Sequence, residues 1–314
     1  MPLAFEYWLF TFLAALGVIQ AAAVKGGLRG LWFFPNPLTG RVCAILLVLI
    51  AFARFFLPMD RNVRGVEGFQ QSYLFVAAAL SALAVTLALP SWLRRGLGPG
   101  KAGEKGLVAL KDRTYSRPSR RGGKRMGADR ALFLHINGWA GQIGPLDLVL
   151  KEVANDYLVP VVLSLFLLWL WFASPGTRRV QLALLAGAVA MGLGDGFIKL
   201  MNFIYYRPRP FTELSVRLIF YRPLDSSFPS NGTAVAFILA TAIFLGNRKT
   251  GAIALAIASL YGFSRVYVGI HYPLDVLGGA VIGILTSYGV YRLLPRLEPL
   301  PSWLLRLGRR LYLA

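Results

Sequence analysis

The sequence has few of the residues on which metal sites and covalent cross-links depend. Its 314 residues include a single cysteine, Cys43, and two histidines. One cysteine excludes both an internal disulfide and a cluster of thiolate metal ligands. Acidic residues are also scarce, because 14 aspartates and glutamates stand against 34 lysines and arginines and leave a net charge of +20. No cluster of carboxylates is available to hold a cation, so we expect neither a metal nor another cofactor.

Charged residues make up only 15% of the chain, whereas hydrophobic residues make up 56%. A soluble domain does not need this balance, but membrane-spanning helices do. The apolar stretches are continuous rather than alternating, which favours helices over the strands of a barrel. We therefore predict an all-α, polytopic membrane helical bundle of about eight transmembrane helices, an integral multi-pass protein of a bacterial or archaeal plasma membrane. The stretches that are long enough, or nearly so, to cross the hydrocarbon core are 8–24, 43–58, 71–93, 157–174, 180–200, 230–247, 251–270 and 276–291.

Basic residues are concentrated between two of these stretches. From Arg94 to Arg130 the chain has twelve lysines and arginines against three acidic residues, with glycine and proline scattered among them. This composition predicts a flexible linker that lies on anionic membrane lipids. We do not expect nucleic acid as a partner, because Tyr115 is the only aromatic residue there that can stack on a base. The oligomeric state is left open. The predicted organisation is an N-terminal three-helix membrane unit (1–93), the basic linker (94–130), a helical core (131–293) and a basic tail (294–314).

The residues with the clearest potential for chemistry lie at the end of an apolar stretch, in the segment 264–275. One of the two histidines, His271, follows Arg265 and precedes Asp275 by four residues. A neutral imidazole can attack phosphorus, an arginine can hold phosphate oxygens in a fork, and a carboxylate can fix the ring tautomer. The spacing alone also allows a lone histidine at the membrane interface with an ion pair nearby.

A second polar segment, 201–230, contains Arg207 and Arg209. The apolar stretches 230–247 and 251–270 are joined by a short turn and should form a helical hairpin. Such a hairpin returns the segment around His271 to the same side as the segment 201–230. We therefore expect two phosphate-binding surfaces from distant parts of the sequence to meet at one membrane boundary.

One motif in this chain resembles a known signature in full. Ser264-Arg265, five residues, His271, three residues and Asp275 keep every fixed position of the third motif of the type 2 phosphatidic acid phosphatase (PAP2) and haloperoxidase superfamily. The resemblance covers roughly residues 131–293. It implies a nucleophilic role for His271, which forms a phosphohistidine, with Asp275 bound to the second ring nitrogen.

The other two motifs are altered. Phe228-Pro229-Ser230-Asn231-Gly232 resembles the second motif, but glycine occupies the position of the family's general-acid histidine. Arg209-Pro210 resembles the end of the first motif, and the residue seven positions earlier is Asn202 rather than lysine. Lys199 lies one helical turn before Asn202. Even if Arg207 were the motif arginine, Lys199 would precede it by one residue more than the motif spacing requires. The resemblance suggests as substrate phosphate-binding residues Arg209, Ser230, Arg265, Lys199 and Arg207.

The loss of histidine at Gly232 bears on the substrate. A general acid protonates the departing oxygen, an effect of about 10² to 10⁴ in rate. A phosphate that leaves from a diphosphate needs less of this help than an alkoxide. The predicted function is a membrane lipid phosphatase or phosphotransferase that prefers a polyprenyl or other lipid diphosphate over phosphatidic acid. The alternative is a catalytically impaired PAP2-like protein that binds lipid phosphate or scaffolds a membrane partner. His135 is the other imidazole that a proton transfer could use.

Overall fold

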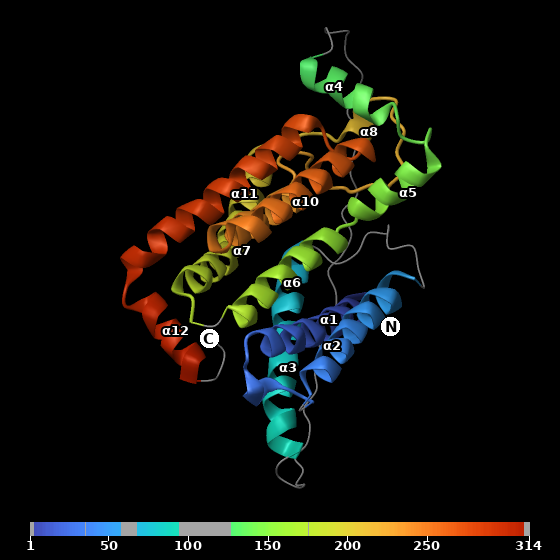
Figure 1. Cartoon of the computed structure of the whole chain (residues 1–314). Coiled ribbons are helices and arrows are strands. Elements are labelled where there is room, and N and C mark those ends of the chain that lie inside the picture. Colours follow the sequence, from blue (N-terminus) through green and yellow to red (C-terminus); the bar gives the residue numbers. More distant parts are fainter. Residues whose placement is uncertain (1–2, 35, 58–67, 94–126, 175, 311–314) are drawn as a thin grey trace, which may run out of the picture.

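The computed structural model describes residues 3–34, 36–57, 68–93, 127–174 and 176–310, and within these ranges all regular elements are helical (Figure 1). The predicted all-α class is confirmed. The elements, in chain order, are α1 (Leu3–Lys25), η1 (Arg29–Leu31), α2 (Pro37–Phe56), α3 (Gly68–Leu93), α4 (Ala128–Asn137), α5 (Gly144–Val153), α6 (Leu158–Ala173), α7 (Arg178–Ile204), α8 (Pro210–Glu213), α9 (Asn231–Gly246), α10 (Arg248–Tyr267), α11 (Pro273–Leu293), η2 (Leu294–Leu297) and α12 (Leu300–Arg310).

Each of the eight apolar stretches lies largely within one helix. Among the described residues, four helices, α1, α2, α7 and α11, are long and apolar enough to cross a membrane, or five spans if α5 and α6 form one span bent by 53°. The shorter apolar segments of α3 and α9 do not reach this length, and the count of eight spans stays a prediction. Most of the predicted basic linker, residues 94–126, lies outside the described residues.

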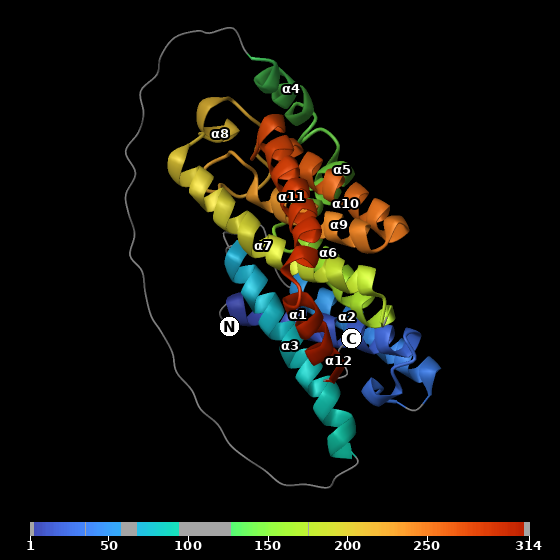
Figure 2. The same ribbon diagram turned by 90° about the vertical axis from the view of Figure 1, so that its left-hand side faces the viewer.

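The helix α6 joins the N-terminal helices to the rest of the bundle. One of its faces packs on α1, where Tyr157, just before α6, is buried against Tyr7 and Phe55. Its other face packs on α9, through Leu163 and Leu170. In Figures 1 and 2 helices α1 to α3 lie in the lower part of the molecule and α4, α5 and α8 at its upper end, while α12 reaches down to the level of the N-terminal helices. The separation of a unit 1–93 from the core remains a prediction, since α6 shares a core with both.

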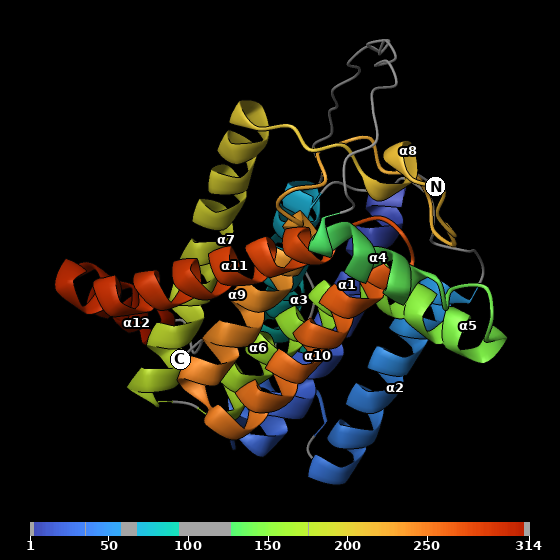
Figure 3. The same cartoon turned by 90° about the horizontal axis from the view of Figure 1, so that it is seen from above.

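The C-terminal helices bring the two polar segments together as the hairpin predicts. Helix α9 packs between α7, α10 and α11, and α4 crosses near the start of α11 at one end of the bundle (Figure 3). Close approach of α11 to α9 depends on glycine, because a β-carbon on Gly279 would lie 2.4 Å from the carbonyl oxygen of Ser230. As a result the starts of the two helices lie side by side, and the Ser230 N–H donates to the Asp275 carbonyl at 3.0 Å.

Candidate functional site

His271 lies in a tight loop between α10 and α11. The loop turns at Gly269, whose φ of +94° is a conformation that favours glycine. Asn137, at the end of α4, holds this loop against the segment that follows α8: its amide donates to the carbonyls of Tyr267 at 2.9 Å and Arg217 at 2.8 Å, and it accepts from the Arg217 N–H at 2.9 Å. Three hydrogen bonds from one buried side chain therefore fix where the imidazole lies.

The hydrogen bonds of the His271 ring define its tautomer. The Nδ1 atom lies 2.9 Å from the carbonyl oxygen of Ser227, which can only accept, so Nδ1 carries the proton. The Nε2 atom lies 3.3 Å from the Nη1 of Arg209, which can only donate, so Nε2 presents its lone pair. Burial lowers the pKa of His271 to about 4, and the nearby Arg209 cation acts in the same direction. The ring is thus held neutral, as a nucleophile must be.

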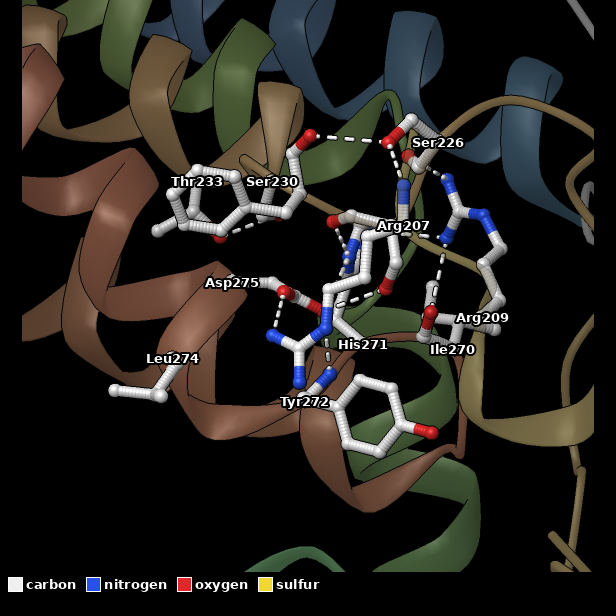
Figure 4. A network of polar contacts seen from close by, with 12 residues as sticks. Arg207, Arg209, Ser226, Ser230, Thr233, Ile270, His271, Tyr272, Leu274 and Asp275 are labelled. Carbon is white, nitrogen blue, oxygen red and sulfur yellow. Dashed lines mark hydrogen bonds and ion pairs between the residues drawn. The ribbon is translucent and has the colours of Figure 1, made fainter. Parts of the chain in front are cut away.

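Asp275 is fully buried and accepts hydrogen bonds from several donors (Figure 4). As the third residue of α11 it accepts from the Tyr272 N–H at 2.8 Å, which caps the helix. It also accepts from the Ser227 hydroxyl at 2.5 Å and from Arg207 at 2.5 Å. Its nearest oxygen lies 3.9 Å from the Nδ1 of His271. The predicted hydrogen bond from the His271 ring to Asp275 is therefore replaced by one from the ring to the Ser227 carbonyl, because the carboxylate accepts from these other donors.

Arg209 and Arg265 are each only 4% exposed and converge from different elements. Arg209, just before α8, donates to the Ile270 carbonyl at 2.9 Å and to the Asp225 side chain at 2.9 Å. Arg265, near the end of α10, donates to the Ala154 carbonyl at 3.1 Å and to the Asp156 side chain. Arg265 also contributes to the lowered pKa of His271. The two arginines that the spacing singled out therefore lie in one cationic site with the histidine.

The other predicted phosphate ligands lie in different settings. Arg207 is directed at Asp275 and, at 2.6 Å, at Asp129, with its guanidinium over the ring of Tyr272. Lys199 pairs with Asp195 one turn earlier at 2.9 Å. The Ser230 hydroxyl is fully buried and lies 2.9 Å from the hydroxyl of Thr233. Arg207 thus braces Asp275, and the phosphate-binding role of these residues remains a prediction.

A cavity of about 870 Å³ opens beside the two arginines. Three buried polar atoms of its lining have no hydrogen-bond partner within the described protein: the Nε of Arg265 and the amide oxygens of Asn202 and Asn231. Buried polar groups are normally paired, so this cluster indicates a place for a polar ligand. Arg265 was expected here. The two asparagines were not, although Asn202 occupies the position where the resemblance places lysine.

The cavity extends from this polar end into apolar surroundings. Its walls include Val76 of α3, Leu168 of α6 and Met191 of α7. The upper end of α3 lies next to α7 in Figure 2, where these walls meet. The N-terminal helices, for which the sequence suggested no role, therefore form one side of the cavity that reaches the buried arginines.

A neutral buried histidine, two buried arginines and a cavity that is polar at one end and apolar at the other define an anion-binding site in a helical membrane protein. The sequence profile of the PAP2 superfamily matches residues 182–299. The undecaprenyl-diphosphatase BcrC of Bacillus subtilis (strain 168) is 30% identical over 176 residues, which are 56% of this chain and 89% of that protein. The bacitracin transport permease protein BcrC of Bacillus licheniformis is 33% identical over 167 residues, 53% of this chain and 80% of that protein. The chain belongs to the PAP2 superfamily.

A solved structure is also similar. The crystal structure of Aquifex aeolicus LpxE aligns at 32% identity with a TM-score of 0.44, over 52% of this chain and 93% of that one. The relatives thus match about half of this chain and most of their own length. The match to the family profile begins at residue 182, after the helices α1 and α3, which line part of the cavity.

Proposed function

We propose that this protein is an integral membrane lipid phosphatase that removes the terminal phosphate of a lipid diphosphate, preferably a polyprenyl diphosphate, through a phosphohistidine at His271. The observation that carries the proposal is the Nε2 atom of His271, which accepts from Arg209 at 3.3 Å and has its proton on the other ring nitrogen. A neutral imidazole with a lone pair on Nε2, placed beside a buried guanidinium, can attack a phosphorus atom whose oxygens the guanidinium binds.

In the proposed reaction, Nε2 of His271 bonds to the terminal phosphorus and the bond to the lipid phosphate breaks. Arg209 and the unpartnered Nε–H of Arg265 bind the non-bridging oxygens and stabilise the charge that develops on them. The Ser227 carbonyl keeps the proton on Nδ1, and the Asp275 carboxylate, 3.9 Å away, stabilises the positive charge that the ring acquires. Water then attacks the phosphohistidine and releases inorganic phosphate.

The cavity supports a lipid as the substrate. Its polar end holds Arg209 and Arg265, and its apolar walls come from α3, α6 and α7. The headgroup would bind at the polar end and the hydrocarbon chain along these helices, which gives the N-terminal unit a part in substrate binding. A diphosphate is favoured over a monophosphate because its leaving group is a phosphate, which departs more readily than an alkoxide and depends less on the lysine and histidine that Asn202 and Gly232 replace. The name of the Bacillus subtilis relative, an undecaprenyl-diphosphatase, points to the same substrate class.

The place of action is proposed on similar grounds. The apolar helices and the membrane relatives support an integral membrane protein, and we propose the plasma membrane of a bacterium or archaeon. The predicted contact of residues 94–130 with anionic lipids would hold that segment at the membrane surface.

The test is phosphate release by the purified protein in detergent from a polyprenyl diphosphate and from phosphatidic acid. We expect turnover of the diphosphate, loss of that turnover in His271→Ala, and an acid-labile phosphohistidine at residue 271 in quenched wild-type reactions analysed by mass spectrometry. His135→Ala is the matched control, because the His135 ring lies on α4 beside Trp139, whereas the His271 ring contacts Arg209. Wild-type activity in His271→Ala would refute the nucleophile. Binding of the lipid without any turnover would favour the catalytically impaired alternative.

A further inference from the structure

The proposed reaction leaves open which group gives a proton to the departing oxygen. Five ionisable groups of the cavity lining besides the two arginines carry a proton that could be donated: Tyr7 and Tyr73 come from the N-terminal helices α1 and α3, and the other three belong to the C-terminal helices and the segments between them. Tyr221 donates its hydroxyl proton to Asp156 at 2.5 Å. Lys199 is paired with Asp195 at 2.9 Å. The remaining group is the phenol of Tyr261, from helix α10.

The hydroxyl of Tyr261 is placed to donate into the cavity. The side chain is 0% exposed, and its oxygen accepts from the Nη1 of Arg265 at 3.2 Å. Within the described part of the chain, no acceptor is recorded for the proton of this hydroxyl. Arg265 is the residue whose unpartnered Nε–H also borders the cavity. The phenol is therefore fixed by the same cation that would hold the phosphate.

Tyr261 also explains the glycine of the altered second motif. A β-carbon on Gly232 would lie 2.5 Å from the Tyr261 hydroxyl oxygen and 3.3 Å from the adjacent ring carbon. No side chain at position 232 fits while Tyr261 occupies this place. The resemblance assigns the proton donor to position 232. The Tyr261 phenol from α10 occupies the space where the β-carbon of a side chain at that position would lie.

We propose that Tyr261 is the general acid of this site, in place of a histidine at position 232. When Nε2 of His271 bonds to phosphorus, the bond from phosphorus to the leaving oxygen breaks and the Tyr261 proton moves to that oxygen. The resulting phenolate is stabilised by the Arg265 guanidinium. In the second step the phenolate takes a proton from the attacking water as the phosphohistidine bond breaks. Both groups then regain their initial protonation.

The experiment rests on the proposed function and compares Tyr261→Phe with Tyr267→Phe. Both tyrosines are buried in α10, and each loses a hydroxyl with hydrogen-bond partners, but Tyr267 bonds to Asp147 and to the Trp139 carbonyl and does not line the cavity. Turnover is measured on a lipid monophosphate, a lipid diphosphate and 4-nitrophenyl phosphate. The alkoxide that leaves from the monophosphate depends strongly on a proton, whereas the phosphate and 4-nitrophenolate leaving groups of the other two substrates depend on it much less.

We expect Tyr261→Phe to lower kcat on the lipid monophosphate by about 10² to 10⁴, to lower it less on the diphosphate, and to leave 4-nitrophenyl phosphate nearly unchanged. Tyr267→Phe should resemble the wild type on every substrate. Equal losses on all three substrates would overturn the proposal, because they would indicate that the hydroxyl only positions Arg265. Unchanged turnover in Tyr261→Phe would overturn it as well. Turnover that persists in His271→Ala would instead refute the nucleophile on which both proposals rest.

Discussion

The contact between Gly232 and Tyr261 allows a stability prediction that does not depend on activity. In Gly232→Ala the new methyl group would lie 2.5 Å from the Tyr261 oxygen, a distance at which one of the two groups must move. Tyr261 has little freedom to do so, because it is fully buried and hydrogen-bonded to Arg265. The substitution should therefore destabilise the protein, although alanine normally favours a helix over glycine by about 1 kcal/mol.

The magnitude follows from the geometry. Overpacking of a buried site costs about 1 to 3 kcal/mol, and the helix preference offsets about 1 kcal/mol of this, so the net loss should be up to about 2 kcal/mol. In Tyr261→Phe the oxygen is gone, and the nearest remaining ring carbons lie 3.3 and 3.4 Å from the added carbon. In that background Gly232→Ala should be neutral or slightly stabilising. The helix preference cancels between the two backgrounds, so the two substitutions should couple by about 1 to 3 kcal/mol, within the range of residues in contact.

The assay is the thermal midpoint of unfolding in one detergent for the wild type, the two single variants and the double variant. We expect Gly232→Ala to lower the midpoint by several degrees relative to the wild type, and Gly232→Ala/Tyr261→Phe to match Tyr261→Phe. Simple additivity of the two single changes would refute the contact. It would also weaken the reason for assigning the proton donor to Tyr261, since the space at position 232 would then be open.

The remaining predictions concern the site and the cavity. Because the pKa of His271 is lowered to about 4, the imidazole stays neutral in mild acid, and the acid limb of kcat/KM should lie well below the ordinary histidine value near 6.5. In the unfolded chain the histidine has its ordinary pKa and is protonated at a higher pH than in the folded protein. The same shift should therefore lower the free energy of unfolding as the pH falls from about 6.5 to 4. In Arg209→Gln the acid limb should move to higher pH and turnover should fall about 100-fold, because the lost cation both binds phosphate and disfavours protonation of His271. An acid limb at an unchanged pH would refute this influence of Arg209 on the pKa of His271. Arg265→Lys should lower kcat strongly despite its charge, since lysine lacks the Nε–H of a planar fork, and full activity would make Arg265 a structural anchor. Gly192→Leu should raise KM for a long-chain lipid diphosphate but not for 4-nitrophenyl phosphate, because Gly192 lines the cavity and has open space at its β-carbon. The control Gly196→Leu should change neither KM, because Gly196 is equally open on the same helix but lies outside the lining. Equal effects of the two variants on KM for the lipid would exclude the cavity as the chain-binding site.

Properties that depend on short spacing and on hydrophobicity were predictable without the structure. The all-α class follows from continuous apolar stretches, because a backbone in lipid must satisfy its own hydrogen bonds. The meeting of Arg209 with His271 follows from the hairpin of α9 and α10, which returns one polar segment to the side of the other. The prediction for Asp275 was right about its proximity and wrong about the bond. Spacing places it near the ring, but it does not reveal that Ser227, Tyr272 and Arg207 compete for the carboxylate.

Which atoms meet within this framework was decided by tertiary structure. The Ser227 carbonyl that sets the tautomer of His271, and the Tyr261 hydroxyl that occupies the space beside Gly232, come from residues 44 and 29 positions away in the chain. Their contacts depend on how far each helix is rotated and how closely it approaches its neighbour, which hydrophobic periodicity does not specify. The cavity wall formed by α3 depends in the same way on how α3 packs against α1 and α7. The sequence alone determined that a histidine and two arginines would share one end of a membrane bundle, and the packing of its helices determined the tautomer, the neighbouring phenol and the apolar cavity that make this end a candidate site for lipid chemistry.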